Sequence, residues 1–278
     1  MFMRALAPAL GQALGQRFLV DNRAGAGGLI AARAAVQSRT DGHTLVCIHS
    51  GFVTLQAMDE HGGPLIALRP IAKLSRSALV VTVRGDAPYR SLSDLIGAVQ
   101  GRPGGLTYAS GGVGSPAHIA VLRLAGIVGR FDAVHVPYKG ALEGDLAVAA
   151  GEVDFHVGLV GTALSLVNSG RVRGLAVTSR QRLPALPSVA TAGESGVPDF
   201  VIEPWVGLAA PWLNSEPAAA RLSEALRRAM ELAAVAQQVQ SLAGVPDFAD
   251  PASFSAQIAR ELEIERELVK RLAPGLPR

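Results

Sequence analysis

The glycine-rich stretch TYASGGVGSPAHIA, at residues 107–120, has the residue spacing that most clearly indicates a chemical role. Gly112, Gly114 and Ala117 fit the G-x-G-x-x-G/A pattern, in which glycines let a pyrophosphate approach the backbone at the start of a helix. The same arrangement of free backbone N–H groups can bind any small anion. The stretch therefore predicts either a dinucleotide site or a simpler anion site.

The strand that follows favours the simpler anion site. A dinucleotide-binding unit needs an acidic residue at the end of its second strand, about 20 residues beyond the glycines, to bind the ribose hydroxyls. Here that strand is AVHVPYKG, which ends in Pro137, Tyr138 and Lys139. Asp132 precedes the strand instead of following it. We therefore expect no cofactor, and a dinucleotide-dependent α/β enzyme is the alternative function.

Residues at the start of the following helix would complete an anion site. Ser115 is placed to be the N-cap and Pro116 the first helical residue, which leaves backbone N–H groups free to face an anion. His118 lies in the first turn, where the helix dipole favours the neutral imidazole as a hydrogen-bond donor. The alternative is structural: Ser115 caps only its own helix, and His118 is packed or exposed.

A second turn, HSGF at residues 49–52, directly follows a strand pattern. Ligands of open α/β sheets bind beyond the carboxyl ends of the strands, so Ser50 and the amide of Gly51 are placed for ligand contact. The earlier RAGAGG turn has glycines at positions 25, 27 and 28, which miss the dinucleotide spacing. That turn indicates close packing and not ligand contact.

The sequence lacks the common catalytic and metal-binding motifs. It has no H-E-x-x-H, C-x-x-C, G-x-x-x-x-G-K or G-x-S-x-G pattern, and its six histidines are not at paired metal-ligand spacings. The single cysteine, Cys47, lies in the apolar pattern HTLVCIHS, where we expect a buried thiol and not a nucleophile. A Ser/His/Asp triad assembled from distant segments stays open, but no feature points to one. We expect a protein that is not an enzyme and holds no metal.

Composition indicates a globular chain that binds no nucleic acid. Of the 278 residues, 49% are hydrophobic and 18% are charged, which is enough to bury a sizeable core. The net charge of +3 comes from dispersed basic residues, and aromatic residues make up only 5%, so neither a basic track nor stacking platforms are expected. No apolar run reaches the roughly 18 to 20 residues that span a bilayer. Leu6, Leu10 and Leu14 predict an amphipathic helix at the start, without a signal-peptide core.

Strand and helix patterns alternate along the chain, which predicts an α/β protein with parallel sheets. QRFLVDN and HTLVCIHS are expected strands, and a later helix is expected to begin at a cap, Ser91 or Ser93. Six prolines between residues 181 and 217 mark connecting segments, and FVIEPWVGLAAP is expected to pass between two lobes. Two long helices close the chain, with Ser215 and Asp250 as their expected caps.

Several stretches occur together in an order that resembles one family: LVDNRAGAGGLIAARAA, DGHTL, YASGGVGSPAH, VHVPYKG, LAVTSRQRLPALPSVATAGESGVPDF and PWVGLAAP. They cover nearly the whole chain and resemble the Bug-type solute receptors of tripartite tricarboxylate transporters. The resemblance implies a type II periplasmic-binding-protein fold, in which two α/β lobes close on a small ligand in the cleft between them. It places the first lobe at residues 1–82 plus 204–278 and the second lobe at residues 83–203.

The resemblance also implies a function. It indicates a monomeric periplasmic receptor that catalyses no reaction, needs no cofactor, and delivers a small carboxylate to the permease subunits of a membrane transporter. The implied ligand-binding positions lie on two facing loops, on one further strand and on the crossing segment. They are, in chain order, Ser50, Gly51, Phe52, Gly112, Gly114, Ser115, His118, Gly158 and Trp205.

Three features depart from the family pattern. Gly158 stands at a position that can be Asp, so we expect a ligand without an ammonium group. Phe52 replaces a small polar residue, which would narrow or desolvate that side of the cleft. The chain starts at the helix that follows the family's first strand and glycine-rich loop, so we expect a misassigned start or a remnant with an exposed sheet edge and weak binding. A degenerate paralogue that binds nothing is a third alternative.

Overall fold

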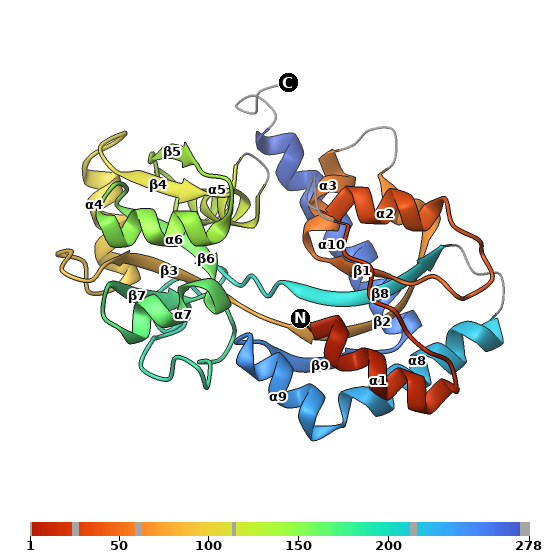
Figure 1. Cartoon of the computed structure of the whole chain (residues 1–278). Coiled ribbons are helices and arrows are strands. Elements are labelled where there is room, and N and C mark those ends of the chain that lie inside the picture. The colour runs from red at the N-terminus through yellow and green to blue at the C-terminus, as the bar shows by residue number, and fades with distance from the viewer. Residues whose placement is uncertain (1, 24–27, 59–62, 113–114, 212–215, 273–278) are drawn as a thin grey trace. The chain divides into compact units, whose positions relative to one another are not determined.

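The computed structural model describes residues 2–23, 28–58, 63–112, 115–211 and 216–272, and the chain divides into two compact units (Figure 1). The first unit comprises Met1–Arg76 and Trp205–Arg278, and the second comprises Ser77–Pro204. The sequence placed the point at which the chain first passes from one lobe to the other after residue 82. It lies between Arg76 and Ser77 instead, because β3 (Leu79–Arg84) pairs with strands of the second unit.

The sheet of the first unit consists, in spatial order, of β1 (Val46–His49), β8 (Trp205–Pro211), β2 (Leu68–Arg76) and β9 (Val245–Ala249). Each neighbouring pair is antiparallel. The prediction of a parallel sheet is wrong for this unit. The reason is that β8, on which the chain returns from the second unit, lies between β1 and β2 and runs against both.

Helices cover both faces of this sheet (Figure 1). One face carries α1 (Phe2–Leu14), α8 (Glu216–Met230) and α9 (Ala233–Ser241). The other face carries α2 (Leu29–Val36), α3 (Gly51–Met58) and α10 (Pro251–Leu272), and the short η2 (Pro64–Ala67) precedes β2. The amphipathic helix predicted at the start is confirmed, because Leu6 and Leu10 pack into the core of this unit. The strand predicted at QRFLVDN is wrong, since residues 17–22 pair with no strand among the described residues.

Cys47 lies on the exposed face of β1, which corrects the expectation of a buried thiol. Val46 and Ile48 point into the core, and successive side chains of a strand point to opposite faces, so Cys47 points away from the core. Although the residue is exposed, the surrounding chain desolvates its sulfur and raises the pKa of the thiol to about 11. The thiol therefore stays protonated near neutral pH and is a weak nucleophile.

The sheet of the second unit consists, in spatial order, of β5 (Val134–Pro137), β4 (Thr107–Ser110), β6 (Phe155–Leu159), β3 and β7 (Val172–Val177). Its helices are α4 (Leu92–Gly101), α5 (Pro116–Val128), α6 (Ala141–Ala150) and α7 (Val160–Asn168). β4 is parallel to β5 and β6, whereas β3 is antiparallel to β6 and β7. The parallel prediction is therefore right around β4 and wrong at β3, the strand on which the chain enters this unit.

Side-chain caps begin two of the helices that the sequence predicted. Ser91 caps α4: its Oγ accepts the N–H of Asp94 at 3.1 Å, and the Asp94 carboxylate accepts the N–H of Ser91 at 3.0 Å. Asp250 caps α10, and its Oδ1 accepts the N–H of Ser253 at 2.9 Å. Ser215 lies outside the described residues. Over the described ranges, none of the helices is long and apolar enough to cross a membrane.

Candidate functional site

The predicted anion loop lies between β4 and α5 in the second unit. Because β4 is parallel to β5 and β6, the carboxyl ends of these strands meet at one edge of the sheet, where α/β proteins bind their ligands. Gly112 has a φ of 101°, a conformation that glycine adopts without strain. Gly114, another predicted site residue, lies outside the described residues. The strand, the turn and the helix follow one another as predicted.

Ser115 and His118 lie close together at the start of α5. The Oγ of Ser115 accepts a hydrogen bond from the N–H of His118 at 3.4 Å, and Pro116 is the first helical residue, so the predicted N-cap is confirmed. His118 is 6% exposed, and its ring packs against that of His135 on β5, with the ring centroids 4.6 Å apart. His118 is thus one member of a packed pair of imidazoles.

Ser110 and His135 are polar residues of this site that the sequence reasoning missed. The Oγ of Ser110 accepts the N–H of Gly112 at 2.9 Å and lies 2.5 Å from Nε2 of His135. The His135 ring also stacks on Tyr108, with the centroids 5.0 Å apart. The signal that could have found them is the parallel pairing of β4 with β5, which places the end of TYAS beside VHVP.

Burial keeps these side chains uncharged near neutral pH. It lowers the pKa of His135, and burial together with the charge of His135 lowers the pKa of His118. Burial also raises the pKa of Tyr108 to about 12, so the phenol keeps its proton. The described part of the turn therefore offers neutral hydrogen-bonding groups to a ligand.

Gly158 lies on β6 beside a buried pair of ionisable side chains. Nδ1 of His156 and Oδ1 of Asp145 are 2.8 Å apart, and both side chains are fully buried. A Cβ atom at position 158 would lie 2.5 Å from Cε1 of His156 and 3.0 Å from Oδ1 of Asp145. A side chain at position 158 would therefore point at this buried pair, and the ring of His156 leaves no room for a residue larger than glycine.

The turn of the first unit joins β1 to α3. The N–H of Ser50 donates to the carbonyl oxygen of Trp205 at 3.1 Å, and the N–H of Gly51 donates to Nδ1 of His49 at 3.2 Å. Phe52 is 1% exposed, and its ring lies edge-on to that of His49 with the centroids 4.8 Å apart. The sequence predicted that Phe52 narrows the ligand cleft, whereas the structure places its ring in the core of the first unit.

Trp205, the first residue of β8, is buried in the same core and is 1% exposed. Its Nε1–H donates to Oε2 of Glu261 on α10 at 2.7 Å. Its ring lies edge-on to Phe254, with the centroids 4.8 Å apart. The structure brings Trp205, Ser50, Gly51 and Phe52 together, but the two aromatic side chains make their contacts inside the unit.

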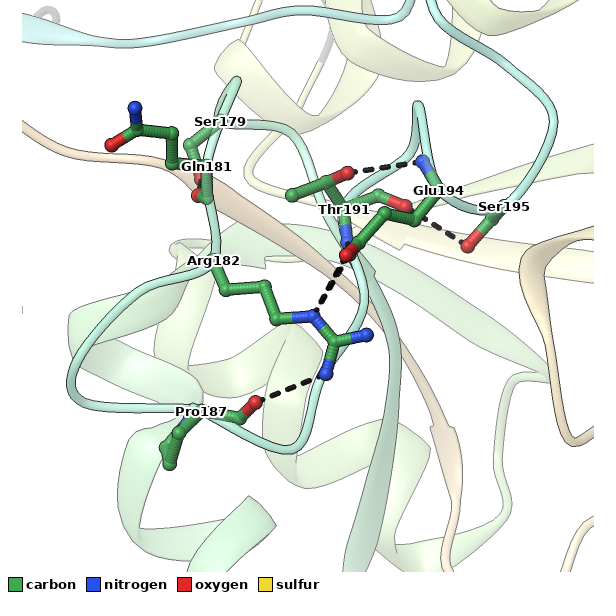
Figure 2. Close-up of polar contacts among 7 residues, drawn as sticks. All are labelled: Ser179, Gln181, Arg182, Pro187, Thr191, Glu194 and Ser195. Carbon is green, nitrogen blue, oxygen red and sulfur yellow. Dashed lines mark hydrogen bonds and ion pairs between the residues drawn. The ribbon is translucent and has the colours of Figure 1, made fainter.

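The stretch after β7, the longest one in the family resemblance, is held by its own polar groups (Figure 2). The N–H of Glu194 donates to Oγ1 of Thr191 at 3.0 Å, and the N–H of Thr191 donates to Oε2 of Glu194 at 2.7 Å. Nε of Arg182 donates to both carboxylate oxygens of Glu194, at 3.1 and 2.9 Å, and Nη1 donates to the carbonyl oxygen of Pro187 at 3.2 Å. These hydrogen bonds join residues of the same loop and stabilise its conformation, which indicates a structural role.

A cofactor or a metal ion would need further groups around the turn of the second unit. Pro137 ends β5, and Tyr138 and Lys139 follow it, so the strand end itself supplies no carboxylate for a dinucleotide ribose; the nearby carboxylate of Glu143 on α6 accepts the N–H of Lys139 at 2.9 Å. Within the parts of the chain that the structure describes, no group of three or more His, Cys, Asp or Glu side chains could hold a metal ion. The described groups suit a small anion better than a dinucleotide.

Comparison with known proteins gives one family match over almost the whole chain. The family model described as "Tripartite tricarboxylate transporter family receptor" matches residues 2–273. The UPF0065 protein of the tcbD-tcbE intergenic region of Pseudomonas sp. strain P51 is 30% identical over 246 residues, which are 86% of this chain and 72% of that protein. Protein BugT of Bordetella pertussis is 30% identical over 268 residues, which are 94% of this chain and 81% of BugT.

Solved structures of similar proteins have the same fold. The periplasmic binding protein BugD is 26% identical, with a TM-score of 0.82 and coverage of 98% of this chain and 92% of BugD. MatC from Rhodopseudomonas palustris, with bound malate, is 26% identical, with a TM-score of 0.80 and coverage of 96% and 93%. Rpa4515 of R. palustris, with adipate, is 25% identical, with a TM-score of 0.84 and coverage of 97% and 91%. The predicted fold class is confirmed.

Proposed function

Because the chain belongs to the family of tripartite tricarboxylate transporter receptors, we propose that it binds a small carboxylate and delivers it to a membrane permease. The observation that carries this proposal is that MatC and Rpa4515, which match nearly the whole chain, hold malate and adipate. Its structural neighbours are solute-binding proteins, so we propose a receptor that catalyses no reaction. We further propose that it acts as a periplasmic monomer, which cell fractionation and size-exclusion chromatography test.

The turn between β4 and α5 is the proposed anion site of the second unit. At the start of α5, Pro116 has no N–H, and the N–H groups of Ser115 and His118 donate to the Gly112 carbonyl and to the Ser115 hydroxyl, so the N–H of Ala117 and the positive end of the helix dipole are the groups proposed to attract a carboxylate. Gly112 allows close approach to the backbone, and Ser115 and His118 add a hydroxyl and an imidazole at the same place. These groups support the site residues that the sequence predicted in this unit.

In the first unit we propose that the Ser50 hydroxyl and the start of α3 contact the solute. The N–H groups of Ser50 and Gly51 already donate within the unit, to Trp205 and to His49. The side chains of Phe52 and Trp205 pack in the core of the first unit next to this turn, and the proposal does not require them to touch the ligand.

The buried pair beside Gly158 bears on the charge of the solute. Gly158 supplies no carboxylate, and the carboxylate of Asp145 is buried and bonded to His156. An ammonium group would thus find no exposed anionic partner at this position. We propose that di- or tricarboxylates and aromatic acids bind in preference to amino acids.

Titration calorimetry and thermal shift on the whole chain test this function. Malate and adipate should raise the melting temperature and release or absorb heat with a defined stoichiometry, whereas glutamate, aspartate and NADH should not. Ser115→Ala should weaken malate binding by about 1.5–3 kcal/mol if the hydroxyl bonds a charged ligand. The matched control is Ser188→Ala, at an exposed serine of the same unit. Tight binding of glutamate without binding of simple carboxylates, or binding of NADH alone, would overturn the proposal.

A further inference from the structure

The turn of the second unit is connected to a pair of histidines through one buried hydroxyl. The N–H of Gly112 donates to Oγ of Ser110 at 2.9 Å, and this oxygen lies 2.5 Å from Nε2 of His135. The ring of His135 packs against that of His118 at 4.6 Å, and the N–H of His118 donates to the Ser115 cap. The two imidazoles are called the histidine pair below: the ring of His135 contacts the start of the turn through Ser110, and the backbone of His118 bonds to Ser115 at its end.

The hydrogen bonds of Ser110 fit a proton on Nε2 of His135. Ser110 is fully buried, and its Oγ lies near three polar atoms: the N–H of Gly112, Nε2 of His135 and the carbonyl oxygen of Gly112 at 3.1 Å. If Nε2 donates, the hydroxyl accepts two hydrogen bonds and donates its own proton to the carbonyl, so every group is satisfied. An imidazolium donates from both nitrogens. The charged form of His135 can therefore keep the same bonds.

The surroundings of the histidine pair allow it one positive charge. Two charged rings with centroids 4.6 Å apart would repel each other, so protonation of one opposes protonation of the other. Tyr108 of β4, the titratable group that stacks on His135, keeps its proton and is neutral. Beyond Tyr108 the rings are apolar: Phe155 of β6 stacks on Tyr108, and Phe131 lies edge-on to Phe155. The nearest charged groups after β5 are Lys139 and Glu143, whose carboxylate accepts the N–H of Lys139 at 2.9 Å. A carboxylate at the turn would add a negative charge beside the neutral rings and would favour the charged form of the pair.

We propose that carboxylate binding at the turn of the second unit is coupled to the uptake of one proton by the histidine pair, with Ser110 as the positioning residue that links the pair to the turn. The proton comes from solvent and returns to it when the carboxylate leaves. This coupling rests on the proposed function, because it requires a carboxylate at this turn. Its consequence is that acidification strengthens capture and alkalinisation favours release.

Calorimetric titration of the whole chain with malate and with adipate, in two buffers of different ionisation enthalpy, measures the protons taken up. At about neutral pH, where a histidine with a lowered pKa is mostly unprotonated, we expect uptake of up to one proton for each carboxylate bound. Between about pH 8 and pH 6 the affinity for malate should rise about five- to tenfold, below the limit of about tenfold per pH unit for one fully coupled proton.

Three glutamine substitutions separate the charge from the packing. His135→Gln keeps an amide near Ser110 but cannot take up a proton, so, relative to its own malate affinity at about pH 8, it should lose most of the rise on acidification. His118→Gln should reduce proton uptake in the same way. His43→Gln, at an exposed histidine of the first unit, should leave uptake and pH dependence unchanged. Ser110→Ala should weaken malate binding about three- to tenfold at both pH values, because the turn loses a buried hydrogen bond.

The outcomes distinguish this coupling from the proposed function. Malate or adipate binding without proton uptake in the wild type would overturn the coupling and leave the receptor function in place. Unchanged proton uptake in both His135→Gln and His118→Gln would also overturn it, since the proton would then go elsewhere. Failure of both carboxylates to bind the wild-type chain would contradict the proposed function and the coupling together.

Discussion

The turn of the first unit and the turn of the second unit share one plan, a strand end followed by glycine and a helix, but their histidines differ in what they contact. His49 accepts a hydrogen bond from the backbone of its own turn and packs edge-on against Phe52 in the core. His135 comes from a neighbouring strand, contacts the side chain of Ser110 and packs against His118. The first turn is thus bonded to one histidine that packs on an apolar core, whereas the second is bonded through Ser110 to a histidine that packs on a second histidine.

This difference teaches that similar local sequences can support a site in different ways. In the first unit the residues expected to touch the ligand by their side chains, Phe52 and Trp205, are 1% exposed and stabilise the fold. In the second unit Ser115 and His118 keep polar groups at the helix start. Substitutions should therefore change mainly stability in the first unit and both stability and binding in the second.

Trp205→Ala should have the largest effect on stability. It removes a large buried ring that packs on Phe254 and a donor to Glu261, so the free energy of unfolding of the first unit should fall by about 3–5 kcal/mol. Calorimetric unfolding, with hydrogen exchange to localise the loss, measures it. Trp205→Phe, which keeps a ring and loses the N–H, should lose about 1.5–3 kcal/mol. Normal stability with lost malate binding would make Trp205 a ligand residue and would break the contrast between the two turns.

Gly158→Ala should have the next largest effect, this time in the second unit. The new Cβ would lie 2.5 Å from Cε1 of His156, and that ring cannot move away easily because it is fully buried and bonded to Asp145. We expect the free energy of unfolding to fall by about 1–3 kcal/mol, the usual cost of overpacking. The matched control is Gly97→Ala on α4, where a Cβ would meet nothing within 4 Å, and which should be neutral or stabilising. An equal response of the two variants would contradict the packing at β6.

The features that sequence reasoning predicted correctly are those set by neighbouring residues. The Ser115 cap, Pro116 and the glycines before them define the turn and the helix start locally, and the leucines of α1 define its buried face. The contact between Ser110 and His135 joins residues 25 positions apart, and it depends on the register of β4 against β5. The direction of β8 depends on where the chain returns from the other unit. Pairing of distant strands has no local signal, so neither the antiparallel order of the first sheet nor the burial of Trp205 can be predicted from neighbouring residues.

Acid should destabilise the second unit through the histidine pair. Burial lowers the pKa of His118 and His135 in the folded chain, so below about pH 6.5, the ordinary histidine value, the unfolded chain binds more protons than the folded one. The stability contributed by the neutral pair is present above that pH, and it is lost as the pH falls from there through the folded-state values. Melting curves over this range should show the loss, and His118→Gln with His135→Gln should flatten it. If the wild type and the double variant lost stability equally as the pH falls, the histidine pair would not account for the acid sensitivity, and the proposed difference between the two turns would be contradicted.

Ser115→Ala should have the smallest effect on stability, and it sharpens the comparison most. The bond from the N–H of His118 to Oγ of Ser115 is long, at 3.4 Å, so its loss should lower the free energy of unfolding by only about 0.5–1 kcal/mol, the lower part of the range for N-caps. Ser91→Ala, at the start of α4, should lower it more, because it breaks a reciprocal pair of bonds with Asp94 at 3.1 and 3.0 Å.

For malate affinity the order of the two variants should be reversed: Ser115→Ala should have the larger effect and Ser91→Ala the smaller. Ser91 belongs to a helix start whose cap bonds are already complete, so Ser91→Ala should leave the affinity for malate unchanged. Ser115 stands at the turn proposed to hold the carboxylate, where loss of a hydrogen bond to a charged group weakens binding far more than loss of a weak cap weakens the fold. A stability change without an affinity change in Ser115→Ala would make this serine a cap alone. The anion site of the second unit would then depend on backbone groups alone, and the contrast between the two turns would be reduced to their histidines.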